Sequence, residues 1–109
     1  MDGTKESFWF NLANGKGEYF APDGSKYRWA RFPSGDLYGL MRWSEKSRGG
    51  ELMHRSEFSY DSSRRLVYDR FARGAAEREG SELPALEERW YAQNGTVRRR
   101  RVDGKDVTP

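Results

Sequence analysis

The chain has 109 residues, no cysteine and a formal net charge of +3, with 20 Lys and Arg against 17 Asp and Glu. The lack of cysteine excludes disulfides, thiolate metal sites and a cysteine nucleophile. Hydrophobic residues make up only 35% of the chain, which taken alone favours disorder, but aromatic residues make up 15%. Since each aromatic ring can bury about 150–250 Å², we expect one folded domain with a thin, aromatic core.

The first residues lack the hydrophobic stretch of a signal peptide, because their apolar part is only Phe8-Trp9-Phe10. No run approaches the roughly 20 apolar residues of a membrane helix. We therefore expect a cytoplasmic protein with no membrane partner. The predicted domain covers residues 8–104, with flexible ends at 1–7 and 105–109.

Turn signals recur along most of the chain, and short aromatic- and arginine-rich runs separate them. They are Asn14-Gly15, Asp23-Gly24, Ser34-Gly35, Gly49-Gly50, Asp61-Ser62-Ser63, Asn94-Gly95 and Asp103-Gly104. Asn-Gly and Asp-Gly supply the positive φ angles of tight hairpin turns. The first predicted strands are 8–12, 16–21 and 26–32, and the alternation in 37–44 predicts a fourth. Residues 45–50 are expected to form a mobile hairpin loop, followed by strands over 51–60 and 64–73.

Residues 74–83 lack aromatics and contain two glycines, so we expect the longest loop there. Residues 81–92 leave two alternatives. A short helix could be capped by Ser81, whereas Leu86, Glu88 and Trp90 also fit the period of two that marks a strand. We favour a strand over 86–93, because Asn94-Gly95 follows it directly as a two-residue hairpin tip with positive φ.

These patterns predict an all-β, or β-rich α+β, domain: a curled antiparallel meander or small barrel of about 6–8 short strands, with at most one short helix near 81–92. Strands with apolar residues on both faces favour a closed barrel or a strongly curled sheet over a flat, one-sided sheet. Two segments, Gly17-Glu18-Tyr19 to Asp23-Gly24 and Trp90-Tyr91 to Asn94-Gly95, resemble MORN-type β-hairpin repeats. The spacing between them is irregular, so no property of that family is transferred to the chain.

The sharpest local feature is the run Arg98-Arg99-Arg100-Arg101. Successive residues of a strand point to opposite faces, so two of these side chains must lie on each face. Since a core cannot hold unpaired guanidinium groups, the strand must be an edge, have wet faces, or meet acidic residues such as Glu87 and Glu88 across the hairpin. One interpretation is protection of a sheet edge. The other is a surface for phosphates or carboxylates, to which Arg64 and Arg65 would contribute.

Several aromatic residues lie in the middle of predicted strands. Core packing is the simpler interpretation, and a stacking platform or pocket wall is the alternative. The residues concerned are Tyr27, Trp29, Trp43, Tyr60 and Trp90, with the single histidine, His54, beside them. His54 alone is typical of a cross-strand residue rather than a catalyst or metal ligand.

No pattern predicts a catalytic residue, a metal site or a cofactor, and no phosphate-binding glycine loop precedes a helix. The sequence therefore favours a non-enzymatic binding or inhibitory protein that presents arginine and aromatic residues to an anionic macromolecule. That partner could be nucleic acid, a nucleoprotein or an acidic protein surface. One alternative is a small barrel that binds or processes an anionic small molecule in an aromatic pocket. Another is an assembly module that forms a homodimer through an edge strand.

Overall fold

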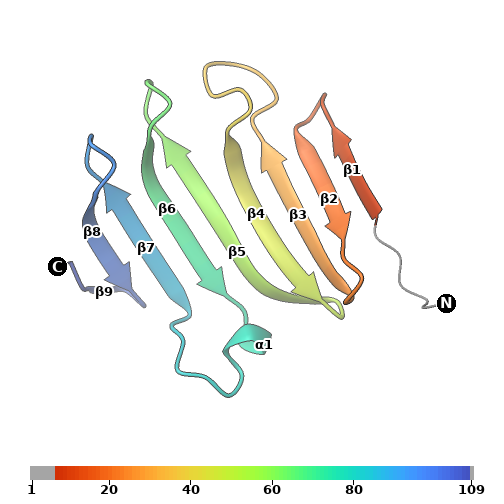
Figure 1. Ribbon diagram of the computed structural model, residues 1–109. Coiled ribbons are helices and arrows are strands. Elements are labelled where there is room, and N and C mark those ends of the chain that lie inside the picture. Colours follow the sequence, from red (N-terminus) through yellow and green to blue (C-terminus); the bar gives the residue numbers. More distant parts are fainter. Residues whose placement is uncertain (1–6, 109) are drawn as a thin grey trace.

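The chain forms a single antiparallel β-sheet in which the spatial order of the strands is the order of the sequence (Figure 1). The computed structural model describes residues 7–108. The strands are β1 (Ser7–Asn11), β2 (Lys16–Phe20), β3 (Ser25–Arg31), β4 (Met41–Arg48), β5 (Glu51–Tyr60), β6 (Leu66–Arg73), β7 (Leu86–Tyr91), β8 (Val97–Val102) and β9 (Lys105–Asp106). The only helix of these residues, α1 (Ala75–Arg78), contacts β5. The predicted all-β meander is thus confirmed.

The sheet is open, so of the two predicted alternatives the meander forms and the closed barrel does not. Strands β1 and β9 lie at opposite ends of the sheet and do not pair with each other (Figure 1). The molecule measures 50 × 40 × 17 Å, and its radius of gyration of 16.2 Å exceeds the roughly 13 Å of a compact domain of this length. Apolar residues on both faces of a strand therefore do not mean that both faces are covered. Here each face is half exposed to solvent.

Residues 7–108 form nine strands rather than six to eight, and two segments differ from the prediction in their secondary structure. The β8–β9 hairpin uses Lys105 and Asp106, which we expected in a flexible tail. The expected loop at 45–50 is mostly strand, since β4 continues to Arg48 and only Gly49-Gly50 forms the turn. Residues 1–6 and 109 lie outside the described residues.

Residues 32–40 form a loop where the alternation predicted that a strand would begin at residue 37. Gly39 has φ +82°, and short-range bonds from Tyr38 N–H to Gly35 O and from Leu40 N–H to Leu37 O fold the segment into successive turns. The one short helix expected near residues 81–92 lies upstream of them: it is α1, in the β6–β7 connection at residues 74–85. The strand favoured over 86–93 is confirmed as β7.

Three hairpins share one turn geometry. Residues 21–25, 61–65 and 92–96 each have a backbone bond between their first and last residues and a second from the fourth residue to the first. The fourth residue has positive φ: Gly24, Arg64 and Gly95. This is the three-residue loop of a type I turn followed by a left-handed residue. The Asn94-Gly95 hairpin and the positive φ of Gly95 are confirmed, but the loop has three residues rather than two.

The buried core is very small. Among residues 7–108, only Ala21 and Ala30 are buried hydrophobic residues, and Ser25 and Asp69 are the buried polar ones. The sheet is therefore held by its backbone ladders and by cross-strand pairs of half-buried side chains, each pair contributing about 0.2–1 kcal/mol. An example is Gly17, whose missing side chain leaves the space occupied by the Trp29 ring on the neighbouring strand.

Candidate functional site

The strand register places a row of charged side chains on one face of the sheet and a group of aromatic side chains on the other. One face, here called the charged face, carries a row of alternating sign that crosses from β2 to β8. Its members are Glu18, Arg28, Glu45, Arg55, Glu57, Arg70, Glu88 and Arg101. The opposite face, here called the aromatic face, carries Phe8, Phe10, Tyr19, Tyr27, Trp29, His54 and Phe71.

Ion pairs link most neighbours in the row on the charged face. Glu45 lies between two arginines, 3.4 Å from Arg28 Nη1 and 2.9 Å from Arg55 Nη1. Arg55 also lies 3.2 Å from Glu57, which pairs in turn with Arg70 at 3.6 Å. The cations of this face are therefore already matched by carboxylates of the same chain, and they offer little net charge to a partner.

The predicted arginine run lies on β8 and divides between the faces as its alternation requires. Arg100 Nη2 binds Glu87 at 2.8 Å, and Arg101 Nη1 lies 3.6 Å from Glu88. These are the acidic residues expected across the hairpin. Arg99 pairs with Asp106 of β9 at 3.4 Å. Within residues 7–108, Arg98 is the one member of the run with no carboxylate partner.

The predicted stacking residues do not form a common pocket. Tyr27 and Trp29 lie on the aromatic face, whereas Trp43 and Trp90 lie on the charged face. Both of these indoles are covered by the protein's own cations. The Arg55 guanidinium lies 4.4 Å from the Trp43 ring, and Arg99 and Arg101 lie 4.9 and 5.2 Å from the Trp90 ring.

Tyr60 is also separate from the other stacking candidates. Its hydroxyl donates to the Met41 carbonyl at 2.8 Å, and its ring contacts Phe32 edge-on. The aromatic-lined barrel interior that we considered from the sequence is therefore absent, because the sheet is open and its intended lining is split between two faces.

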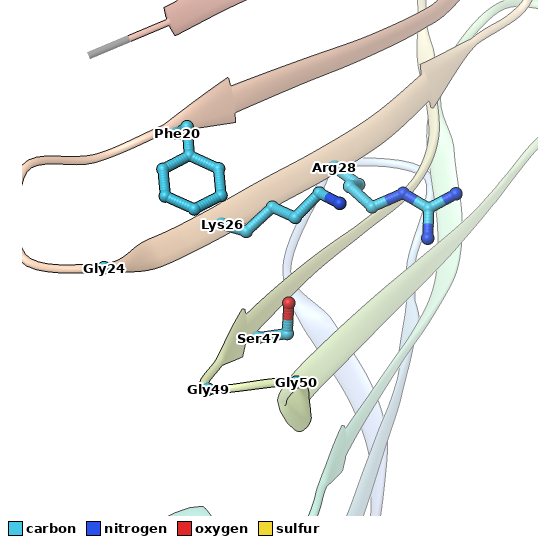
Figure 2. A pocket seen from close by; sticks show the side chains of 7 residues that line it. All are labelled: Phe20, Gly24, Lys26, Arg28, Ser47, Gly49 and Gly50. Carbon is cyan, nitrogen blue, oxygen red and sulfur yellow. The ribbon is translucent and has the colours of Figure 1, made fainter. Parts of the chain in front are cut away.

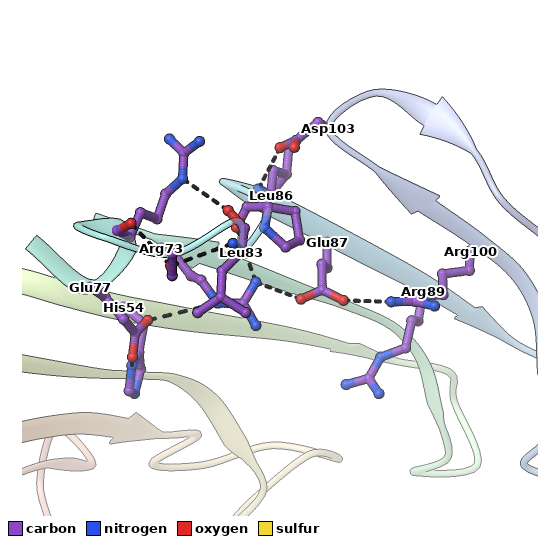
Figure 3. Close-up of polar contacts among 12 residues, drawn as sticks. His54, Arg73, Glu77, Leu83, Leu86, Glu87, Arg89, Arg100 and Asp103 are labelled. Carbon is purple, nitrogen blue, oxygen red and sulfur yellow. Dashed lines mark hydrogen bonds and ion pairs between the residues drawn. The ribbon is translucent and has the colours of Figure 1, made fainter. Parts of the chain in front are cut away.

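His54 belongs to a polar network that fastens the β6–β7 connection to the aromatic face (Figure 3). Its Nδ1 lies 2.9 Å from Glu77 of α1, and its ring packs against Phe71 at 5.1 Å. Glu87 lies between Arg73 and Arg100, with oxygen–nitrogen distances of 2.6 and 2.8 Å. Hydrogen bonds from these guanidinium groups, Arg100 first, hold the pKa of Glu87 below its ordinary value. These contacts join α1 to β5 and β7 to its two neighbouring strands.

Asp69 is the one buried carboxylate among the described residues, at 6% exposure. Arg89 donates two hydrogen bonds to it, at 3.0 and 3.1 Å, and the Tyr91 hydroxyl donates a third at 2.6 Å. Burial, followed by the bond to Asp69, raises the pKa of Tyr91 to about 12. All three groups satisfy one another, so this cluster fixes β6 against β7 rather than serving a ligand.

Most of the cations that have no carboxylate partner within residues 7–108 gather at one edge of the sheet. This edge, the upper rim, consists of the turns 12–15, 32–40, 61–65 and 92–96, with two residues of each adjoining strand end (upper edge in Figure 1). Its basic residues are Lys16, Arg31, Arg42, Arg64, Arg65 and Arg98, and its acidic residues are Asp36 and Asp61. The formal charge is thus 6 − 2 = +4.

The opposite edge, the lower rim, has the opposite sign. It consists of the turns 21–24, 49–50, 74–85 and 103–104 with two flanking residues each, and it holds eight acidic and six basic residues, for a charge of −2. Several of its cations are paired, as Arg48 is with Asp23 at 3.1 Å. Charge is therefore segregated along the strand direction, although the chain as a whole is only weakly basic.

The upper-rim cations are exposed and bind only neutral groups of the chain. Arg64 donates to the carbonyls of Asp36 and Tyr38 at 2.8 and 3.1 Å, and Arg65 donates to the Gln93 carbonyl at 3.4 Å. Arg31 donates to the Gly39 carbonyl at 3.0 Å. These bonds orient the guanidinium groups without neutralising them, so the charge remains available to an anion.

Hollows of the surface occur on both rims. On the upper rim, a pocket of about 130 Å³ lies between the first hairpin and the β3–β4 loop, lined by Phe10, Leu12, Arg31 and Tyr38 among others. A second, of about 360 Å³, lies beside Arg65 and the 92–95 turn. On the lower rim, a hollow of about 460 Å³ lies beside Lys26 and Arg28 (Figure 2). Both of these cations already face Glu18.

Three of the predicted binding residues, Arg64, Arg65 and Arg98, lie on the upper rim. Lys16 and Arg42 were not among the predicted binding residues, because they are isolated in the sequence. Their position at strand ends beside turn signals was the one available indication. Over residues 7–108 no group of three potential metal ligands occurs, and no helix is long and apolar enough to cross a membrane. Comparison of the chain with protein families, curated proteins and solved structures gives no match.

Proposed function

We propose that this is a non-enzymatic binding protein whose upper rim contacts an anionic macromolecule, with nucleic acid as the favoured partner. The observation that carries the proposal is the gathering of six exposed cations, none paired with a carboxylate within residues 7–108, along one edge of the sheet. Elsewhere on the sheet, most arginines are matched by neighbouring acids. An unneutralised row of this kind attracts a polyanion and releases its counterions.

The arrangement of the upper-rim cations favours a linear polyanion, rather than a broad acidic surface, as the partner. The cations run from β2 to β8, which at about 4.8 Å per strand corresponds to a length on the order of 30 Å. The sheet is one layer, and the smallest dimension of the molecule is 17 Å. A long, narrow row matches the regularly spaced phosphates of a nucleic acid strand. Its guanidinium forks also suit phosphate oxygens.

The β3–β4 loop adds an aromatic side chain to the upper rim. Tyr38 is 57% exposed, and its carbonyl accepts a bond from the upper-rim residue Arg64. Stacking of an unpaired base on such a ring contributes about 1–3 kcal/mol. Single-stranded nucleic acid is therefore a better match than a duplex, whose bases are not free to stack on a protein ring.

The test compares two variants that change net charge equally on opposite rims. Arg65→Ser/Arg98→Ser removes two upper-rim cations, and Arg78→Ser/Lys105→Ser removes two lower-rim cations without carboxylate partners. Each takes the net charge from +3 to +1. In each pair one arginine donates to a carbonyl, Arg65 to Gln93 and Arg78 to Leu83. The loss of native contacts is therefore matched as well.

Binding of a labelled single-stranded oligonucleotide is followed by fluorescence anisotropy at several salt concentrations. For the upper-rim pair we expect weaker binding and a slope of log K against log salt shallower by about 1.4, from about 0.7 per lost phosphate contact. The lower-rim pair should behave like the wild type. Equal effects of the two pairs, or no binding by the wild type at low salt, would overturn the proposal. Preference for poly-glutamate over the oligonucleotide would instead identify an acidic protein as the partner and contradict the assignment to nucleic acid.

A further inference from the structure

The two end strands of the sheet differ in how they are protected from pairing. At one end, β9 is two residues long, carries Lys105 and Asp106, and is followed by bonds from Val107 N–H to Arg100 O and from Arg100 N–H to Thr108 Oγ1. At the other end, β1 has the sequence Ser-Phe-Trp-Phe-Asn, with no charge and no proline, and pairs with β2 in an unbroken register. Natural edge strands usually carry charge, proline or a bulge, and β1 carries none of these.

The hydrogen-bonding direction of β1 follows from the register of its neighbours. Ala21 N–H bonds Ser25 O, and Gly15 O accepts from Arg31 N–H, so the odd-numbered residues of β2 direct their backbone toward β3. Its even-numbered residues therefore bond to β1, where their partners are Ser7, Trp9 and Asn11. It follows that Phe8 and Phe10 direct their N–H and C=O groups away from the sheet.

The side chains of β1 are exposed on both faces. Phe8, Trp9 and Phe10 are 67%, 47% and 37% exposed. Within residues 7–108, β1 thus combines a backbone edge without a partner strand and three exposed aromatic rings, which a further strand would cover. Since β1 has no formal charge, pairing it with an identical strand places no like charges opposite each other.

We propose that β1 pairs antiparallel with β1 of a second copy of this chain, about a two-fold axis perpendicular to the sheet and centred on Trp9. In this register Phe8 lies opposite the partner copy's Phe10, and Phe10 opposite its Phe8. These are the residues whose backbone groups are free, so both pairs form their two hydrogen bonds. Trp9 then lies opposite its own copy in the closer, non-hydrogen-bonded position, on the charged face. The interface is isologous and closes at two chains.

This dimer does not depend on whether the upper rim binds nucleic acid, but it determines how the upper rims of the two copies are arranged. A two-fold axis perpendicular to the sheet reverses the strand direction, so the two upper rims lie on opposite long edges of an 18-stranded sheet. A dimer would then hold two polyanion sites that face apart. Because a five-residue edge covers less than the roughly 800 Å² per partner of a standard interface, we expect a reversible dimer that dissociates on dilution, with Kd in the micromolar range.

The experiment uses the whole chain and analytical ultracentrifugation over a range of concentrations up to several hundred micromolar. The wild type should change from monomer to dimer, and no larger species should form. Trp9→Lys and Trp9→Glu each place like charges opposite one another at the axis, so each should weaken self-association about tenfold or more. Mixing the two variants should restore the dimer, because Lys then faces Glu.

Two further variants control for folding and for the choice of edge. Val107→Lys changes an exposed residue beside β9 and should leave the dimer unchanged. Phe10→Pro removes an N–H that points away from β2, so it should abolish pairing while circular dichroism still shows the sheet. The proposal is overturned if the wild type stays monomeric at every concentration or forms open-ended oligomers. It is also overturned if the Val107→Lys variant no longer dimerises. A mixture of the Trp9 variants that stays monomeric while each retains its circular dichroism spectrum overturns it as well.

Discussion

Tyr91→Phe should change how the stability of the sheet depends on pH above neutrality. Burial and the 2.6 Å bond to Asp69 raise the pKa of Tyr91 from 10 to about 12. The unfolded chain therefore releases this proton first, and the native state loses stability as the pH rises from about 10 through about 12. A shift of two units corresponds to at most about 2.7 kcal/mol, which solvent screening at this half-exposed site reduces to about 1–2 kcal/mol.

At neutral pH the same variant should be less stable than the wild type by about 1.5–3 kcal/mol, since it loses a hydrogen bond to a charged, buried acceptor. That deficit should shrink by about 1–2 kcal/mol between about pH 9 and pH 12, because the wild type alone loses the contribution of Tyr91. Urea unfolding followed by tryptophan fluorescence at a series of pH values measures both quantities.

Tyr38→Phe serves as the control, because its ring is 57% exposed and lies in a loop. The difference between its unfolding free energy and that of the wild type should be the same at every pH. Tyr68 should behave like Tyr91, because burial and a 2.6 Å bond to Glu88 raise its pKa to about 12. If the stability difference between Tyr91→Phe and the wild type stays constant up to pH 12, the prediction is wrong. Asp69 would then not hold the phenol in its neutral form.

Three other variants test how a single-layer sheet is held together. Gly17→Ala should destabilise by about 1–3 kcal/mol in urea unfolding, because a Cβ there would lie 2.3 Å from ring atoms of Trp29. Gly95→Val should cost about 1 kcal/mol or more and lower Tm, because its φ of +89° is unfavourable for a β-branched residue. Glu45→Gln should cost about 1 kcal/mol at low salt and less at high salt, because it removes the carboxylate shared by Arg28 and Arg55. An unchanged stability in any of the three variants would contradict the contact or the backbone geometry on which its prediction rests.

The sequence was most informative about turns, since their chemistry is local. Asn94-Gly95 and Asp103-Gly104 identify hairpins because few residues other than glycine, asparagine and aspartate adopt positive φ easily. The same rule missed the 61–65 turn geometry, in which Arg64 takes the left-handed position with φ +67°. It also missed the start of β4, because Leu37 and Gly39 continue a period-two pattern that short-range hydrogen bonds override in the structure.

The candidate site was harder to predict because it depends on register. The run at 98–101 stands out in the sequence, yet three of its four arginines meet acidic partners across β7 and β9. Conversely, Arg31 and Arg42 are unremarkable in the sequence. They join the upper rim because β3 ends, and β4 begins, at the same edge of the sheet. Whether a charge is paired depends on its neighbours on the adjacent strands. The local sequence pattern does not predict those neighbours.

The most direct test of the upper rim as the binding surface is amide chemical-shift mapping of the whole chain with a single-stranded oligonucleotide. We expect shifts that saturate with the oligonucleotide and cluster in the turns 12–15, 32–40, 61–65 and 92–96, with the 49–50, 74–85 and 103–104 turns unchanged. Shifts concentrated along the row of charges on the charged face, or on the lower rim, would contradict this expectation.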